Sequence, residues 1–146
     1  MQIAVSSLQR RNGYVLDSYA LLAYLEAEPG SNRIRELLET AKKDKTYLYM
    51  CVVNLGEVMY IVERERGLSK AQETLARIAE LPIDIVDADR NLTLTAFHLK
   101  TECPVAYADC FAAALSQVKN AILITGDPEF RNFKPDCKLQ IEWLPK

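Results

Sequence analysis

Four acidic residues, far apart in the sequence, stand where a carboxylate serves either as a structural cap or as part of a reactive site. Asp17 follows the short apolar run Tyr-Val-Leu, and Asp127 follows Ala-Ile-Leu-Ile-Thr-Gly. Glu57 and Asp109 fall in segments of helical spacing, among neighbours that are mostly apolar or small. Taken singly, each acid has an ordinary explanation as a helix cap, a turn residue or the partner of a helix N-terminus.

Gathered in one place, the four carboxylates would need a compensating cation. Two unit charges about 4 Å apart repel by roughly 4 kcal/mol at an effective dielectric of about 20. Such a cluster either takes up protons or binds a cation, and carboxylate oxygens suit hard divalent ions such as Mg²⁺ or Mn²⁺. We therefore hypothesise one acidic site for Mg²⁺ or Mn²⁺, whose convergence only a folded structure can test.

The elements that would position these acids alternate between strand and helix patterns. Strands are predicted over 14–17, 46–53, 83–87, 121–125 and 139–144, the last as an edge strand. Helices are predicted between them, with Ser31, Asn54, Ser69 and either Asp87 or Asp89 as N-caps. This order predicts a three-layer α/β/α sandwich with a central, mostly parallel sheet of about five strands. Ligands bind beyond the carboxyl ends of such strands, where Asp17 and Asp127 stand.

Length and composition predict one folded domain. The chain has 146 residues, of which 49% are hydrophobic and 26% charged, as in ordinary globular proteins. Residues 1–13 read as a flexible N-terminal arm and residues 14–146 as the single domain. No secretory signal or membrane-spanning run is visible, which predicts a cytoplasmic protein without membrane contact.

Charge and cysteine content narrow the function classes. The net charge of −2 gives no global sign of a nucleic-acid binder, although basic residues cluster locally. Arg64 stands seven residues after Glu57, on the same predicted helix face, and is a candidate phosphate contact. The four cysteines form no CxxC pair and only one histidine, His98, is present, so zinc binding is disfavoured and free thiols are expected.

Four stretches resemble those of a known family, in the same order and at the usual separations. They are VLDSYALLAYLEAEPG, VVNLGEVMYIVERERG, YADCFAAALS and LITGDPEF, and they span residues 14–130. The chain is similar in them to PIN-domain nucleases, and most closely to the VapC-like toxins of type II toxin–antitoxin systems. Each stretch is weakly specific by itself, whereas the four in sequence are strongly specific.

The resemblance implies a metal-dependent endoribonuclease that hydrolyses RNA with Mg²⁺ or Mn²⁺, leaving a 5′-phosphate and a 3′-hydroxyl. It places the family's catalytic and metal-binding acids on Asp17, Glu57, Asp109 and Asp127. Supporting polar positions fall on Ser18, Asn54 and Thr125, and Arg64 stays the candidate RNA contact. Relatives often carry serine before Tyr-Ala-Asp, where this chain has Ala106. The family also implies an RNA substrate, a small antitoxin partner and a homodimer.

Two alternatives within the PIN family stay open, whereas three other classes of function are disfavoured by the sequence. A PIN nuclease that processes RNA without being a toxin, and a catalytically silent PIN interaction module, are the alternatives within the family. Silent modules usually lack one or more acids, and all four are present. A receiver-type phosphoacceptor or a dehalogenase-like phosphatase would need paired acids after the first strand, where Asp17 is followed by Ser18 and Tyr19. Hydrolysis by a serine or cysteine nucleophile is disfavoured because the sequence contains no Gly-x-Ser-x-Gly nucleophile elbow.

Overall fold

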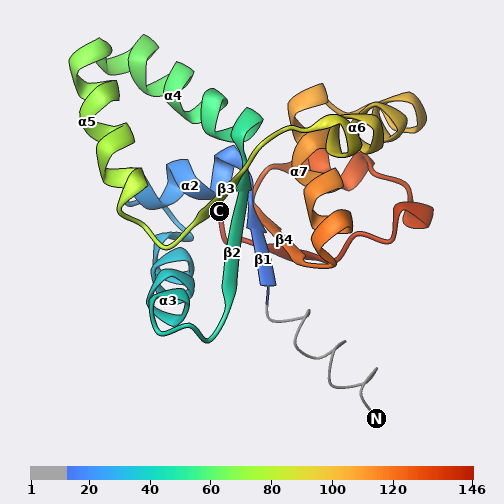
Figure 1. The fold of residues 1–146 in the computed structure, drawn as a ribbon, viewed down its shortest axis with the longest axis horizontal. Helices are drawn as coiled ribbons and strands as arrows, with labels where there is room; N and C mark the ends of the chain where they lie inside the picture. Colours follow the sequence, from blue (N-terminus) through green and yellow to red (C-terminus); the bar gives the residue numbers. More distant parts are fainter. Residues whose placement is uncertain (1–12) are drawn as a thin grey trace.

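The computed structural model describes residues 13–146, and its centre is a sheet of five strands that are all parallel (Figure 1). The spatial order of the strands is β3-β2-β1-β4-β5. Their bounds are β1 Gly13–Leu16, β2 Tyr47–Cys51, β3 Asp84–Val86, β4 Ile122–Thr125 and β5 Ile141–Trp143. The predicted α/β/α class, the five strands and the edge position of the last strand are confirmed.

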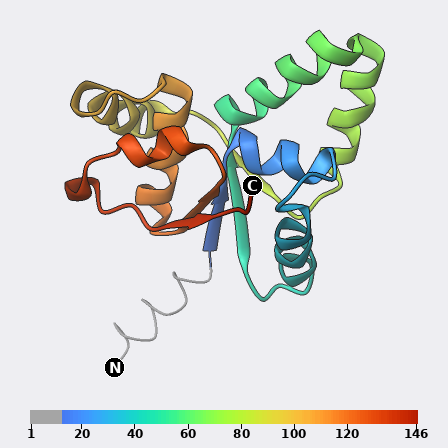
Figure 2. The ribbon, with the colours of Figure 1, turned by 180° about the vertical axis from the view of Figure 1, so that it is seen from behind.

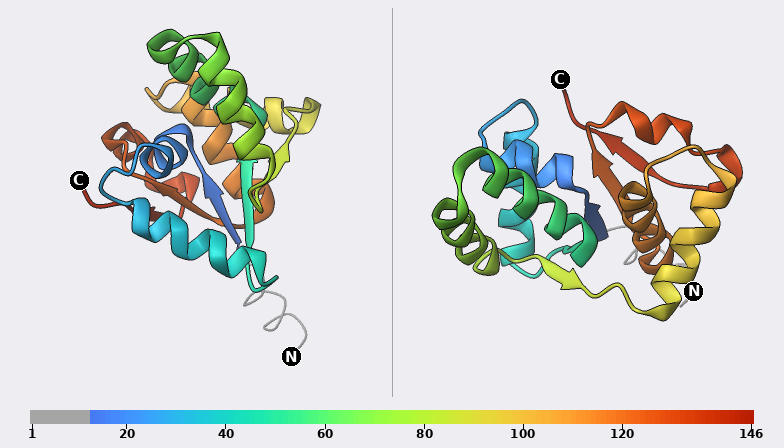
Figure 3. Two further views of the ribbon diagram at one scale, coloured as in Figure 1. Left: turned by 90° about the vertical axis from the view of Figure 1, so that its left-hand side faces the viewer. Right: turned by 90° about the horizontal axis from the view of Figure 1, so that it is seen from above.

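Helices cover both faces of this sheet. The α-helices are α2 Ser18–Leu25, α3 Ser31–Lys42, α4 Val52–Arg66, α5 Leu68–Ala79, α6 Arg90–Glu102 and α7 Tyr107–Lys119. Helices α6 and α7 pack on one face, whereas α2 and α3 pack on the other. The α4–α5 pair joins the second layer over β2 and β3, and in the right-hand view of Figure 3 α5 lies on the far side of α4 from α6 and α7.

Two short 3₁₀ helices, η1 Pro128–Asn132 and η2 Pro135–Cys137, connect β4 to β5. Side chains of this connection pack against the core that α6 and α7 form, and Figure 2 shows it (red) beside those helices. The segment between the carboxyl end of β4 and the edge strand β5 therefore belongs to the same layer as α6 and α7.

Alternating side chains of the central strands enter the two layers. Val15 and Leu123 face α6 and α7, whereas their neighbours Leu16 and Ile124 face α2 and α3. All four are fully buried. Near-continuous apolar strands are what a parallel sheet covered on both faces requires.

The predicted boundary at Asn54 is wrong. Helix α4 begins at Val52 with Cys51 as its N-cap residue, so Asn54 lies inside the first turn. The β-branched pair Val52 and Val53 favoured a longer strand, but the pairing of β2 with β3 ends at Cys51. Because no strand pairing involves the residues after Cys51, the chain is free to begin helix α4 at Val52.

Two predicted serine caps are also wrong. Ser31 is the first residue of α3, and Gly30, with φ of 98°, occupies the cap position. Ser69 lies inside α5, which follows Gly67. In both places a glycine makes the turn between helices, so no side-chain cap is used. Of the two aspartates predicted before α6, Asp89 is the cap, and its Oδ1 accepts the Leu92 N–H at 2.9 Å.

The amino-terminal boundary also shifts slightly. Strand β1 includes Gly13, which the sequence had assigned to the N-terminal arm, and the rest of that predicted arm lies outside the described residues. No helix within residues 13–146 combines the length and apolar character needed to cross a membrane.

Candidate metal centre

The site begins at the carboxyl edge of the sheet, where the strand order reverses around β1. Strands β2 and β4 flank β1 on opposite sides, and parallel sheets bind ligands beyond the carboxyl ends of the strands at such a point. The register pairs Leu16 with Ile124, so the next residues, Asp17 and Thr125, emerge side by side. Asp17 is 1% exposed and caps α2, its Oδ1 accepting the Ala20 N–H at 2.9 Å.

Thr125 links two of the predicted acids. Its hydroxyl donates to Oδ2 of Asp17 and accepts the backbone N–H of Asp127 at 3.0 Å. Asp127 in turn caps η1, because its Oδ1 accepts the Glu129 N–H at 2.9 Å. The backbone here runs close to Tyr19, since a Cβ on Gly126 would lie 2.3 Å from that ring. A small residue is therefore required where the chain turns out of β4.

Helix α7 supplies the next acid. Asp109 lies in its first turn, 6% exposed, on a helix whose alanines allow close packing. One carboxylate oxygen each from Asp109, Asp127 and Glu129 lies within 4.8 Å of the other two. Glu129 also accepts the Ala106 N–H at 2.7 Å, which fastens the start of α7 to the turn after β4.

Glu57 reaches the same region from α4. The buried Asn54 side chain donates from Nδ2 to Glu57 Oε1 at 3.3 Å and to the Ala108 carbonyl at 3.0 Å. One amide thus ties α4 to α7 directly beside Asp109. Among residues 13–146 the Asn54 Oδ1 atom is buried without a hydrogen-bond partner. Asn54 therefore links α4 to α7 through its side chain and is not a helix cap.

Burial and the repulsion between carboxylates raise the pKa values of Asp17 and Asp109. Desolvation by burial, partly offset by the hydrogen bonds from Thr125 and Ala20, raises the pKa of Asp17 from 3.8 to about 7. Desolvation also raises the pKa of Asp109 to about 7, and the charges of Asp127 and Glu129 add to the rise. Glu57 contributes repulsion to both aspartates. Asp17 and Glu57 therefore lie near enough to affect this region electrostatically, although the three carboxylates that gather within 4.8 Å among the described residues are those of Asp109, Asp127 and Glu129.

The donor set of this cluster fits a hard divalent cation. Its candidate ligands are carboxylate oxygens, without nitrogen or sulfur, and Mg²⁺ and Mn²⁺ prefer such ligands. The raised pKa values point the same way, because a bound dication would stabilise the ionised carboxylates that burial disfavours. The residues present can therefore hold the ion that the sequence analysis implied.

Glu129 is the member of the cluster that the sequence analysis missed. It follows Asp127 by two residues in the stretch GDPEF, and a second acid in that turn was its only signal in the sequence. Of the other predicted residues, Ser18 is half-buried beside Asp17 at the start of α2. Arg64 is exposed on α4, with its guanidinium 5.1 Å from the centre of the Tyr60 ring.

Comparison with known proteins identifies the family. The family model described as the PIN domain matches residues 14–134. A search of the curated proteins found no match.

Solved structures match over most of the chain. A chain of VapBC2 from Rickettsia felis, solved with a DNA fragment from its promoter, has a TM-score of 0.71 and 20% identity, covering 91% of this chain and 99% of that one. DNA-bound VapBC from Salmonella typhimurium has a TM-score of 0.71 and 17% identity, and the match covers 89% of this chain and 96% of that one. VapC20 from Mycobacterium tuberculosis, a toxin that cleaves the sarcin–ricin loop, has a TM-score of 0.59 and 16% identity. The match covers 83% of this chain and 96% of that one. At these identities the likeness is one of fold.

Proposed function

This chain belongs to the PIN domain family, and on that premise we propose that it is a Mg²⁺- or Mn²⁺-dependent endoribonuclease, the toxin of a toxin–antitoxin pair. The observation that supports the proposal is the group of carboxylates from Asp109, Asp127 and Glu129, with the buried Asp17 joined to Asp127 through Thr125. Buried carboxylates with raised pKa values are costly to a fold, so their gathering favours a catalytic role over a structural one.

The proposed roles follow from where each acid is held. Asp17, Asp109 and Asp127 hold the cation directly or through water, and Glu57 either ligates it or orients the attacking water. When bound, the cation supplies Lewis-acid polarisation of the scissile phosphate and of that water. The reaction is in-line hydrolysis of an RNA phosphodiester, with a 5′-phosphate and a 3′-hydroxyl as products.

Neighbouring polar groups fix the geometry of these acids. Thr125 holds Asp17 and Asp127 at a set separation, because one hydroxyl bonds to both. Asn54 holds Glu57 against α7 in the same way. Ligands fixed by a second layer of hydrogen bonds bind and act better than free side chains. We propose that both residues position the acids and take no part in proton transfer.

The toxin assignment rests on the nature of the matched structures. Several are toxin–antitoxin proteins, and VapC20 from M. tuberculosis is described as a toxin that cleaves the sarcin–ricin loop. We propose accordingly that this chain binds a small antitoxin protein, forms a homodimer and works in the cytoplasm, with residues 14–146 as its single nuclease domain. Arg64, two helical turns from Glu57, is the proposed phosphate contact.

A cleavage assay tests the nuclease proposal. Purified protein should cut RNA in the presence of Mn²⁺, and either EDTA or Asp17→Asn should stop the cutting. A matched control is Asp44→Asn, because Asp44 is exposed before β2 and has φ of 58°, a conformation that asparagine also adopts. That variant should cut like the wild type. RNA cleavage by purified Asp17→Asn, or cleavage by the wild type that EDTA does not reduce, would contradict the proposed site.

A further inference from the structure

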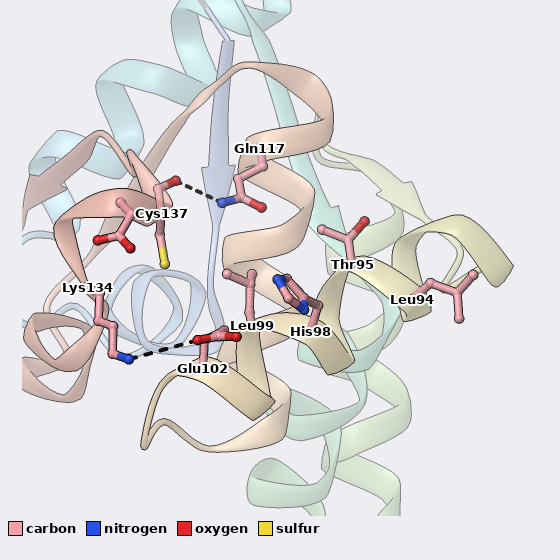
Figure 4. A pocket seen from close by; sticks show the side chains of 9 residues that line it. Leu94, Thr95, His98, Leu99, Glu102, Gln117, Lys134 and Cys137 are labelled. Carbon is pink, nitrogen blue, oxygen red and sulfur yellow. Dashed lines mark hydrogen bonds and ion pairs between the residues drawn. The ribbon is translucent and has the colours of Figure 1, made fainter.

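A second concave region lies apart from the acidic cluster, on the outer side of α6 and α7. It is a groove of about 650 Å³, within the size range of small-molecule sites. Helix α6, helix α7 and the η2 region contribute its walls (Figure 4). The lining residues are Leu94, Thr95, His98, Leu99, Glu102, Gln117, Lys134, Asp136 and Cys137. None of them belongs to the acidic cluster, so the proposed nuclease reaction leaves this groove without a role.

One thiol lines the groove and a second lies behind it. Cys137 lines it, and Figure 4 shows the Cys137 sulfur pointing toward the space beside Lys134 and Leu99. The sulfur of Cys103 lies 3.8 Å from that of Cys137. Cys103 is 2% exposed at the end of α6, whereas Cys137 is only half-buried. One thiol is therefore open to a reagent and the other stands directly behind it.

We propose that Cys103 and Cys137 form a modification site, at which a low-molecular-weight disulfide oxidises the two thiols to an intramolecular disulfide. The reagent enters the groove and meets Cys137 first. This proposal is independent of the nuclease activity, since it rests on residues outside the acidic cluster.

The two exchange steps balance without a further oxidant. The Cys137 thiolate attacks one sulfur of the reagent, forms a mixed disulfide and releases one thiolate of the reagent. The Cys103 thiolate then attacks the Cys137 sulfur, forms the protein disulfide and releases the second thiolate. Two protons leave the cysteines and two reagent thiols result, so the reagent is reduced and the protein dithiol is oxidised.

To form the bond, the two sulfurs must close from 3.8 Å to the bonded length of about 2.05 Å. Most residues of the segment 131–140 are exposed, so it can shift more easily than the buried end of α6. Two contacts keep the shift small. Gln117 donates from Nε2 to the Cys137 carbonyl at 2.8 Å, and Lys134 lies 3.9 Å from Glu102.

The new bond would also enclose most of the acidic cluster. Asp109, Asp127 and Glu129 all lie between Cys103 and Cys137 in the sequence, so the disulfide closes a covalent loop around them. Loop closure of this length restricts the unfolded chain and should raise the melting temperature by about 10 °C.

The experiment treats reduced, native protein with oxidised glutathione at about pH 8.5, where the thiolates are better populated. The intact mass should fall by two hydrogens with no glutathione retained, and peptide mapping should join Cys103 to Cys137. The Cys103→Ser variant should instead keep one glutathione on Cys137, because no second thiol resolves it. Cys51→Ser is the matched control, since Cys51 is fully buried in β2, and it should form the same disulfide as the wild type.

Three results would overturn the proposal: lasting glutathione on Cys137 in the wild type, a different cysteine pair in the map, or reaction only after unfolding. Should Cys103→Ser fail to fold, Cys137→Ser gives the complementary reading. Because Cys137 is only half-buried, this variant should keep a native circular dichroism spectrum and form no intramolecular disulfide, and a disulfide between two other cysteines in it would count against the assignment.

Discussion

Replacing Asp17 with asparagine should make the metal-free protein more stable at alkaline pH while abolishing its activity. Asp17 is 1% exposed, and burial raises its pKa from 3.8 to about 7. Because the folded protein binds this proton more tightly than the unfolded chain, stability falls as pH rises between these two values. Above about pH 7 the full penalty applies, and the shift corresponds to about 4 kcal/mol.

Asparagine removes this charge at a smaller cost. Its carbonyl oxygen can still accept the Ala20 N–H, and its amide can donate to the Thr125 oxygen, which leaves the Thr125 hydroxyl without its carboxylate acceptor. That loss costs about 1–2 kcal/mol. In EDTA at about pH 8, Asp17→Asn should therefore be more stable than the wild type by about 2–3 kcal/mol. At about pH 5, where the penalty on Asp17 is mostly absent, the difference should be about 1 kcal/mol or less.

Urea unfolding followed by circular dichroism measures both differences. Manganese should add stability to the wild type and much less to Asp17→Asn, because the variant lacks one ligand. An Asp17→Asn protein whose stability relative to the wild type in EDTA is no greater at about pH 8 than at about pH 5 would refute this reasoning. That result would mean that the buried carboxylate carries no electrostatic penalty for a cation to relieve.

Three further substitutions probe the surroundings of the cluster. Glu129→Gln keeps an oxygen for the Ala106 N–H but removes a charge, so calorimetry should give about tenfold weaker Mn²⁺ binding with stability nearly unchanged. Equal Mn²⁺ affinity would exclude Glu129 from the site. Gly126→Ala places a Cβ 2.3 Å from the Tyr19 ring, so urea unfolding should show a loss of about 1–3 kcal/mol, and an unchanged stability would contradict this contact. Arg64→Gln should weaken binding of RNA to the Asp17→Asn protein and lower the salt slope by about one, and an unchanged slope would remove Arg64 as a phosphate contact.

The fold was predictable because its signals are local. The central strands are short apolar runs that alternate with helical patterns, and an acid follows β1 while a glycine follows β4, so the fold class follows from the sequence. Asp17 and Asp127 could be picked out for the same reason, since both follow strands. Their meeting depends on the register of β1 with β4, which no local pattern encodes.

The features that were missed depend on partners distant in the chain. The resemblance names Asn54 as a supporting position, but the prediction that it is also a helix cap is wrong, because its amide bonds to the Ala108 carbonyl on another helix. Glu129 bonds to the backbone of Ala106, 23 residues earlier, and joins Asp109 only when α7 packs beside the turn after β4. Such roles arise from helix packing, which single-sequence patterns do not determine.

The central claim is that these acids together hold a divalent cation, and the most direct measurement is anomalous X-ray diffraction from crystals soaked in Mn²⁺. The account predicts one or two peaks within ligand distance of Asp17, Asp109 and Asp127, which Asp17→Asn should weaken. Crystals that bind Mn²⁺ only elsewhere, or leave these carboxylates without a peak at saturating Mn²⁺, would contradict it.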